Sequence, residues 1–227
     1  MPAVKQLAFI SHHHEDREIA SSIDRVVQMF GFEGFLAHRD LDGGTEWLRE
    51  IKEKIANSVV LIAVLTPKFV ESDWTDHEVG FATGKGVPVL PIIVNSVKPY
   101  GFMADIQGTR WDQDYKYYNT SDSATHDALI GNALKARGVL DRAQIIESLC
   151  SSGSFHATRV LILGLGDIES VSDPEVITIA RAVSKNKHLN DCNEAKAAFS
   201  HRIERVRNRL DNDVYQELTS LGVLSQK

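Results

Sequence analysis

The sequence predicts an α/β fold in which a doubly wound, parallel five-stranded sheet is followed by a mainly helical C-terminal region. Short apolar runs alternate with helical patterns through the first half of the chain, which favours parallel strands joined by right-handed crossovers. The run SVVLIAVLT, residues 58–66, is apolar on both faces, as a central parallel strand is. After about Ser121 the strand-like patterns fade and helical periodicity replaces them.

The first strand and helix are predicted within residues 6–31. Residues 6–11, QLAFIS, form a short apolar run typical of a buried strand, and the polar residues 12–16 follow as a loop. The next helix has one apolar stripe, made of Ile19, Ile23, Val26, Val27 and Phe30. Gly31 favours the end of this helix there, because glycine adopts a left-handed backbone at little cost.

The same unit recurs further along the chain. A second strand is predicted in residues 31–37, and a turn-rich segment, RDLDGGTEW, leads to a helix that carries Leu48, Ile51 and Ile55 toward the core. After the central strand, the predicted elements are a helix over 73–83, a strand in 87–94 and a candidate fifth strand in 108–111. Sheets of this kind bind ligands beyond the carboxyl ends of their strands.

The C-terminal region is predicted to be a second, helical module. We expect domains at 1–137 and 138–227, the second regulatory or oligomerising, and helices near 123–137, 141–150, 174–186 and 191–211. Ser172 and Glu175 have the spacing of a capping box, with Pro174 at the first helical turn. The segment 153–169 is compatible with either a strand or a buried helix.

Composition excludes several classes of protein. The net charge of −6 argues against bulk binding of nucleic acid, which needs a basic surface. Two cysteines, Cys150 and Cys192, are too few for a disulfide framework and match no metal motif. We expect no signal peptide, no membrane span and a cytoplasmic location.

Four segments follow one another at a recognisable spacing: AFISHHHED, RDLDGGTEW, VVLIAVLTPKFVESDW and WTDHEVGFA. Together they resemble a bacterial Toll/interleukin-1 receptor (TIR) domain, of the NAD-hydrolysing, antiphage-defence type, over about residues 5–137. The resemblance implies a flavodoxin-like fold. It also implies that residues 39–46 form the variable connection called the BB loop.

The segment Trp74-Thr75-Asp76-His77-Glu78 resembles the Trp-x-x-x-Glu element of TIR domains that hydrolyse NAD. The resemblance implies that Glu78 is catalytic, although Thr75 stands where the family often has cysteine. Helical spacing places Trp74 one turn before Glu78 on the same face. By the same resemblance, substrate contacts are expected from Phe9, Ser11, His12, Arg39, Asp40, Leu41, Trp47 and Trp74.

The chemistry of NAD fits a single carboxylate. Nicotinamide leaves as a neutral molecule, so the reaction mainly needs negative charge beside an oxocarbenium-like ribose, which Glu78 can supply. The product is ADP-ribose or a cyclic ADP-ribose, and NAD is the substrate rather than a cofactor. Family behaviour implies activity on self-association of TIR domains, in bacterial immune defence, with an effector or sensor protein as a further partner.

Other readings remain open or are set aside. A non-enzymatic TIR adaptor, or a virulence mimic acting through TIR–TIR contacts, is the alternative to an enzyme. A phosphoacceptor receiver domain would need acids where Ser11 and Thr66 stand. We expect no metal at His12 to His14, because adjacent residues at a strand end point in different directions. Residues 164–169 lack the third glycine of a dinucleotide fingerprint, and we read them as structural.

A basic stripe on the last predicted helix consists of Arg202, Arg205 and Arg209. Such stripes are usually solvated helix faces, and we expect that here. Docking of an acidic partner is the alternative.

Overall fold

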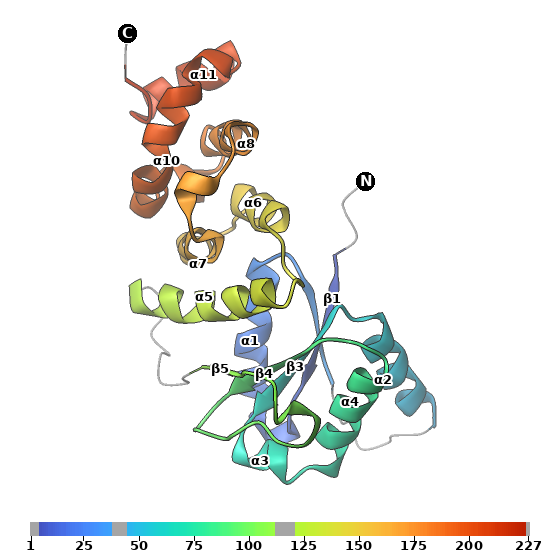
Figure 1. Cartoon of the computed structure of the whole chain (residues 1–227). Coiled ribbons are helices and arrows are strands. Elements are labelled where there is room, and N and C mark those ends of the chain that lie inside the picture. The colour runs from blue at the N-terminus through green and yellow to red at the C-terminus, as the bar shows by residue number, and fades with distance from the viewer. Residues whose placement is uncertain (1–4, 38–44, 112–120, 226–227) are drawn as a thin grey trace. The chain divides into compact units, whose positions relative to one another are not determined.

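The computed structural model describes residues 5–37, 45–111 and 121–225. The chain divides into two compact units, drawn in Figure 1. The first comprises Met1–Tyr117 and Leu129–Leu140, and the second comprises Tyr118–Ala128 and Asp141–Lys227. The domain boundary between residues 137 and 138 stays a prediction.

The first unit is built on a five-stranded sheet in which every pair of neighbouring strands is parallel. Its strand order is β2-β1-β3-β4-β5 (Figure 1). The strands are β1 (Leu7–Ser11), β2 (Glu33–Leu36), β3 (Val60–Leu65), β4 (Val89–Ile93) and β5 (Thr109–Arg110). All six residues of β3 are buried, as predicted for the central strand. The α/β fold class and its five strands are confirmed.

Helices α1 (Arg17–Met29) and α2 (Thr45–Asn57) follow β1 and β2, and α3 (Pro67–Val70) and α4 (Asp73–Gly84) both lie between β3 and β4. Helices α2 and α4 share one hydrophobic core with alternate residues of the sheet, including Ile55, Val79, Leu61 and Ala63. In Figure 1 these two helices lie together on one side of the sheet and α1 lies on the other. This is the doubly wound arrangement expected from the sequence.

The apolar stripe predicted on α1 faces inward, since Ile23, Val27 and Phe30 are fully buried. Gly31 follows with a φ of 87°, the left-handed conformation that ends the helix. A second glycine, Gly131 in α5 (Ser121–Ala136), lies directly against the ring of Phe30. A Cβ there would approach the ring to 2.2 Å, so this close contact requires glycine.

The second unit is helical within its described residues (Figure 1). Its helices are α6 (Arg142–Cys150), α7 (Phe155–Leu165), α8 (Asp173–Val183), α9 (Lys187–Asn190), α10 (Asn193–Val206) and α11 (Asn212–Ser220), together with the start of α5. The capping box predicted at Ser172 and Glu175 is present. The last helix predicted at 191–211 is shorter, because a 3₁₀ turn over Arg207–Arg209 ends it, and α11 was not predicted.

The ambiguous segment 153–169 forms helix α7. Ser154 caps the helix, its hydroxyl accepting a hydrogen bond from the backbone N–H of Ala157. Val160 and Leu161 are buried, and Gly166 ends the helix with a φ of 78°. A capping serine and a terminal glycine therefore decide between the two structures that the apolar run allowed.

Arg202 corrects our expectation of a solvated basic stripe on α10. Its side chain is only 6% exposed, and its guanidinium donates hydrogen bonds to backbone carbonyl oxygens of the turn between α7 and α8. Nη1 donates to the carbonyl oxygens of Ile168 and Glu169 at 2.8 and 2.7 Å, and Nη2 donates to that of Val171. Arg205 is exposed, so only part of the predicted stripe faces solvent.

We expect Arg202→Lys to lower the free energy of unfolding of the helical unit by about 2 kcal/mol. An ammonium group donates from one nitrogen, whereas the guanidinium reaches these carbonyl oxygens from two, and each buried acceptor left without a donor costs about 1–3 kcal/mol. Thermal unfolding followed by far-ultraviolet circular dichroism measures the change. Arg205→Lys, the same substitution at an exposed site of the same helix, is the control. Equal stability of the two variants would contradict this role of Arg202.

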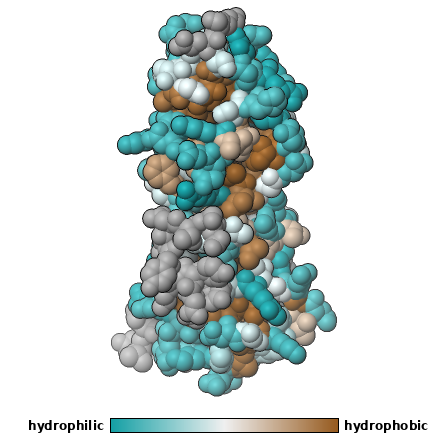
Figure 2. All heavy atoms as spheres, turned by 90° about the vertical axis from the view of Figure 1, so that its left-hand side faces the viewer, coloured by the Kyte–Doolittle hydropathy of each residue, from teal (hydrophilic) through white to brown (hydrophobic). Residues whose placement is uncertain are grey.

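Polar residues dominate the face of the molecule in Figure 2, with separate patches of apolar side chains between them. Among the described residues, no helix combines the length and the apolar character that crossing a bilayer requires.

Candidate active site

Glu78 lies on the inward face of helix α4, where the main candidate site is found. The chain leaves the carboxyl end of β3 at Thr66, which caps α3 by accepting from the N–H of Phe69. Thr75 then holds the first turn of α4 in place, since its hydroxyl lies 2.8 and 2.7 Å from the carbonyl oxygens of Phe69 and Ser72 and shares its one hydrogen between them. One turn later Glu78 is only 3% exposed. A buried acid is expensive unless it is hydrogen-bonded, so its partners matter.

Both oxygens of the Glu78 carboxylate accept hydrogen bonds. The hydroxyl of Ser11, the last residue of β1, donates to Oε2 at 2.5 Å. The indole Nε1–H of Trp74 donates to Oε1 at 3.0 Å. The predicted one-turn spacing of Trp74 and Glu78 is thereby confirmed. We call this arrangement of Ser11, Trp74 and Glu78 the carboxylate clamp.

Burial controls the protonation of Glu78. Loss of solvent raises its pKa, and the hydrogen bonds from Ser11 and Trp74 lower it by a smaller amount. The net effect is a rise from the usual 4.5 to about 7. Among the described residues, no neighbouring charge is a cause of this shift. A carboxyl group that titrates near neutral pH at the end of a parallel sheet is a candidate functional group.

Aromatic side chains lie beside the clamp. Trp47, near the start of α2, stacks on Trp74 with ring centroids 4.8 Å apart and an interplanar angle of 28°. The ring of His77 meets Trp74 edge-on, with centroids 6.2 Å apart. These rings and the surrounding core exclude water from Glu78, which strengthens electrostatic interactions at the carboxylate.

The other residues expected to contact substrate do not all lie at the site. Phe9 is fully buried and packs on Phe35 with ring centroids 5.5 Å apart, so the structure gives it a place in the core rather than at the site. His12 is 7% exposed, and its Nδ1 lies 3.1 Å from the carbonyl oxygen of Ile10. Arg39, Asp40 and Leu41, and with them most of the expected BB loop, lie outside the described residues.

Sequence reasoning missed two polar contacts near the clamp. Asp76 accepts a hydrogen bond from the hydroxyl of Tyr100 at 2.7 Å, and the hydroxyl of Thr66 donates to Asp16 at 2.5 Å. The partners are 24 and 50 residues apart, so no local pattern links them. The one feature of the sequence that pointed to such contacts was the presence of polar residues after β1 and β3.

The histidine run differs from what the sequence predicted. The rings of His13 and His14 do not diverge but lie with centroids 4.2 Å apart. With Glu15 they offer ligand atoms within 4.8 Å of one another. Glu15, however, forms an ion pair with Lys68, and the backbone N–H of Glu15 donates to Nδ1 of His13. The expectation that no metal binds here stays a prediction.

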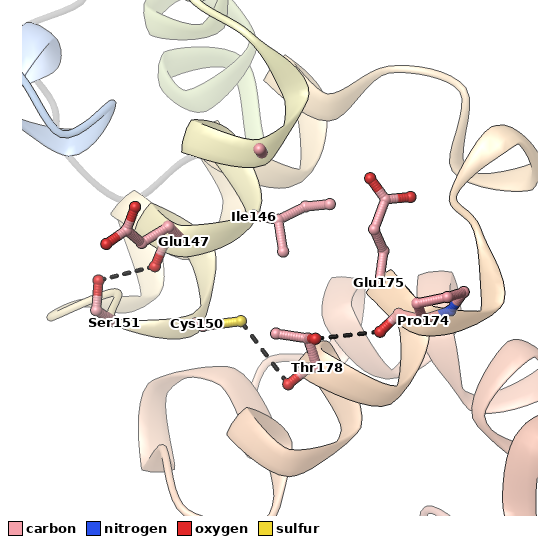
Figure 3. Close-up of a pocket in the computed structure, with 8 residues that line it drawn as sticks. Ile146, Glu147, Cys150, Ser151, Pro174, Glu175 and Thr178 are labelled. Carbon is pink, nitrogen blue, oxygen red and sulfur yellow. Dashed lines mark hydrogen bonds between the residues drawn. The ribbon is translucent and has the colours of Figure 1, made fainter. Parts of the chain in front are cut away.

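The helical unit contains an apolar cavity of about 540 Å³ between α6 and α8 (Figure 3). Ile146, Cys150 and Thr178 line it, and the thiol of Cys150 lies 4.0 Å from the carbonyl oxygen of Thr178. Burial, with a smaller effect of Glu147, raises the pKa of the Cys150 thiol to about 11. The thiol is therefore protonated at neutral pH and is no nucleophile.

Comparison with known proteins identifies the first unit. A family model described as TIR domain matches residues 8–138, more than half of the chain. Among solved structures, the chain is similar to the TIR domain of the Toll-related receptor TRR-2 from Hydra magnipapillata, with 22% identity and a TM-score of 0.40. That similarity covers 46% of this chain and 82% of the other. No curated protein matches the chain.

Proposed function

Because the chain belongs to the TIR domain family, we propose that it cleaves the nicotinamide–ribose bond of NAD with Glu78 as the catalytic carboxylate. The observation that carries the proposal is the carboxylate clamp, which holds one buried acid by both oxygens. Other TIR domains act as adaptors, and an adaptor has no need of a buried acid whose pKa is raised to about 7. Burial of an acid without an ion pair lowers the stability of the folded chain. A buried Glu78 therefore favours a functional role for this residue over a purely structural one.

The proposed reaction uses the ionised form of Glu78. As the bond to nicotinamide breaks, its electron pair leaves with the pyridinium ring, which becomes neutral nicotinamide. Positive charge develops on the ribose, and the Glu78 carboxylate stabilises it while accepting hydrogen bonds from ribose hydroxyls. Water then attacks, giving ADP-ribose and a proton released to solvent. Attack by a nucleophile within the same molecule gives a cyclic ADP-ribose instead.

Access to the carboxylate requires a change in the resting site. Glu78 is 3% exposed, and Trp47 stacks against the indole that binds it. We therefore infer that NAD enters after Trp47 moves, and that contact between TIR domains promotes this movement. Phe102 favours such a contact surface, because its aromatic side chain is 70% exposed. Its ring lies beside α4, 3.6 Å from where a Cβ on Gly80 would be.

The proposal is tested by incubating the purified chain with NAD at dilute and at crowded protein concentrations. Chromatography of nicotinamide and the ADP-ribose species measures turnover and identifies the product. We expect nicotinamide release per chain to rise with protein concentration, because assembly opens the site. Absence of release under every assembling condition would favour the adaptor function.

Trp74→Phe is expected to reduce nicotinamide release by about 10- to 100-fold at pH 7, since one hydrogen bond to a charged group is worth about 1.5–3 kcal/mol. The substitution keeps an aromatic ring against Trp47 but removes the donor to Oε1 of Glu78. Trp111→Phe makes the same chemical change next to β5 and serves as the control. If both variants turn over NAD equally, the indole N–H has no part in the reaction.

A further inference from the structure

Ser11 lies where a substrate contact was expected, but its surroundings indicate a different task. The residue is fully buried, and its hydroxyl donates to Oε2 of Glu78 at 2.5 Å. It ends β1 and pairs with Ala63 of β3, so its backbone belongs to the middle of the sheet. The hydroxyl has no exposed surface and donates its one hydrogen to Glu78, so none is left to donate to NAD.

We propose that Ser11 is a positioning residue, which fixes the orientation and the protonation state of the Glu78 carboxylate and makes no contact with substrate. This inference rests on the proposed function. It reassigns Ser11 from the substrate-binding set to the carboxylate clamp.

The two donors of the clamp differ in how firmly they are held. Trp74 lies on the same helix as Glu78 and stacks on Trp47, so entry of substrate beside the indole disturbs its surroundings. Ser11 is anchored in a strand with neighbours on both sides, β2 and β3. The bond from Ser11 is therefore the more firmly held of the two when the aromatic pair opens. It keeps the carboxylate aimed at the ribose throughout the reaction.

The clamp also leaves capacity for substrate. A carboxylate offers about four acceptor positions, two on each oxygen. Ser11 occupies one position on Oε2 and Trp74 occupies one on Oε1. One position on each oxygen remains, and neighbouring ribose hydroxyls can donate to both. Positioning by Ser11 is thus compatible with substrate binding on the same carboxylate.

Four titratable groups that follow β1 or flank Glu78 on α4 are engaged elsewhere. Asp16 accepts from Thr66 on the β1 side, and Asp76 on α4 accepts from Tyr100. His12 directs Nδ1 to a backbone carbonyl oxygen, and His77 packs its ring against Trp74. Within the described chain, burial and the two clamp hydrogen bonds are the causes of the shifted pKa of Glu78. Loss of the Ser11 hydroxyl should therefore act on Glu78 directly.

The test compares Ser11→Ala with Ser11→Thr, which keeps the hydroxyl. Carbon-13 NMR of glutamate carboxyl groups, with Glu78 assigned by its absence from Glu78→Gln, follows titration without any substrate. We expect Ser11→Ala to raise the pKa of Glu78 by about one unit. In the pH profile of kcat/KM, the loss of activity should be about 5-fold larger at pH 7 than at pH 9, where the loss that remains reports the orientation of the carboxylate. KM at pH 9 should stay within about 2-fold.

Ser58→Ala is the matched control, because Ser58 is also a buried serine of the first unit, donating to the carbonyl oxygen of Lys54 at 2.7 Å. It should leave both the pKa and the profile unchanged. An unchanged pKa in Ser11→Ala, or a raised KM at pH 9 with an unshifted profile, would overturn the positioning role. If the unsubstituted protein releases no nicotinamide, the proposed function fails, yet the NMR titration still decides whether Ser11 controls Glu78.

Discussion

Glu78→Gln should lower nicotinamide release by about 100- to 1,000-fold, the loss typical when one electrostatic contact to a transition state is removed. Glutamine has the shape of glutamate and fits the clamp. Its amide oxygen can accept from Trp74, and its NH₂ group can donate to the hydroxyl of Ser11. The substitution therefore removes the negative charge while keeping the packing. The loss should appear in kcat, because the carboxylate acts on charge that develops only in the transition state.

Single-turnover measurements at saturating NAD separate this loss from weaker binding. Glu71→Gln, the same change at an exposed position just before α4, is the control and should keep full activity. Release of nicotinamide by Glu78→Gln at the rate of the unsubstituted chain would refute the catalytic assignment of Glu78.

The same variant should be more stable than the unsubstituted protein at pH 8, by about 3 kcal/mol. Burial raises the pKa of Glu78 from 4.5 to about 7, so the folded chain binds a proton more tightly than the unfolded chain does. Between these two pH values unfolding releases a proton, and the free energy of unfolding falls as pH rises. Above pH 7 the whole penalty of a buried charge is present. Glutamine never carries that charge.

Urea unfolding at pH 5 and pH 8, followed by tryptophan fluorescence, measures the difference. All three tryptophans, Trp47, Trp74 and Trp111, belong to the first unit, so the signal reports the unit that contains Glu78. At pH 5 the gain should be below about 1 kcal/mol, because Glu78 is then almost fully protonated in the folded chain. A gain of the same size at both pH values would show that a cause other than ionisation is responsible.

The order of elements in the first unit was predictable because each carries a local pattern. The apolar run of β3 and the stripe of α1 read directly as a central strand and an amphipathic helix. The contact between Trp74 and Glu78 also followed from sequence, since residues four apart meet on a helix. Glu78 itself was found through a resemblance, because one acid on a helix gives no signal of its own.

Contacts across the sheet were beyond local patterns. Ser11 and Glu78 are 67 residues apart, and only the topology of the sheet brings the end of β1 to α4. The prediction for Arg202 was wrong because its charge suggested a solvated face. Its guanidinium instead donates to carbonyl oxygens of a turn that lies 31 to 34 residues earlier in the chain. The run in α7 stayed ambiguous because uniform apolar character does not distinguish a buried helix from a strand.

The closed aromatic pair over Glu78 has a consequence for the cost of each catalytic cycle. A carboxylate that rests in water must shed its hydration shell whenever a substrate arrives, and that reorganisation adds to every barrier. Here Trp47 and Trp74 cover a carboxylate that folding has already removed from solvent. On the proposed mechanism, most of the dehydration of the acid takes place during folding, and the stability lost then lowers the work of every later turnover.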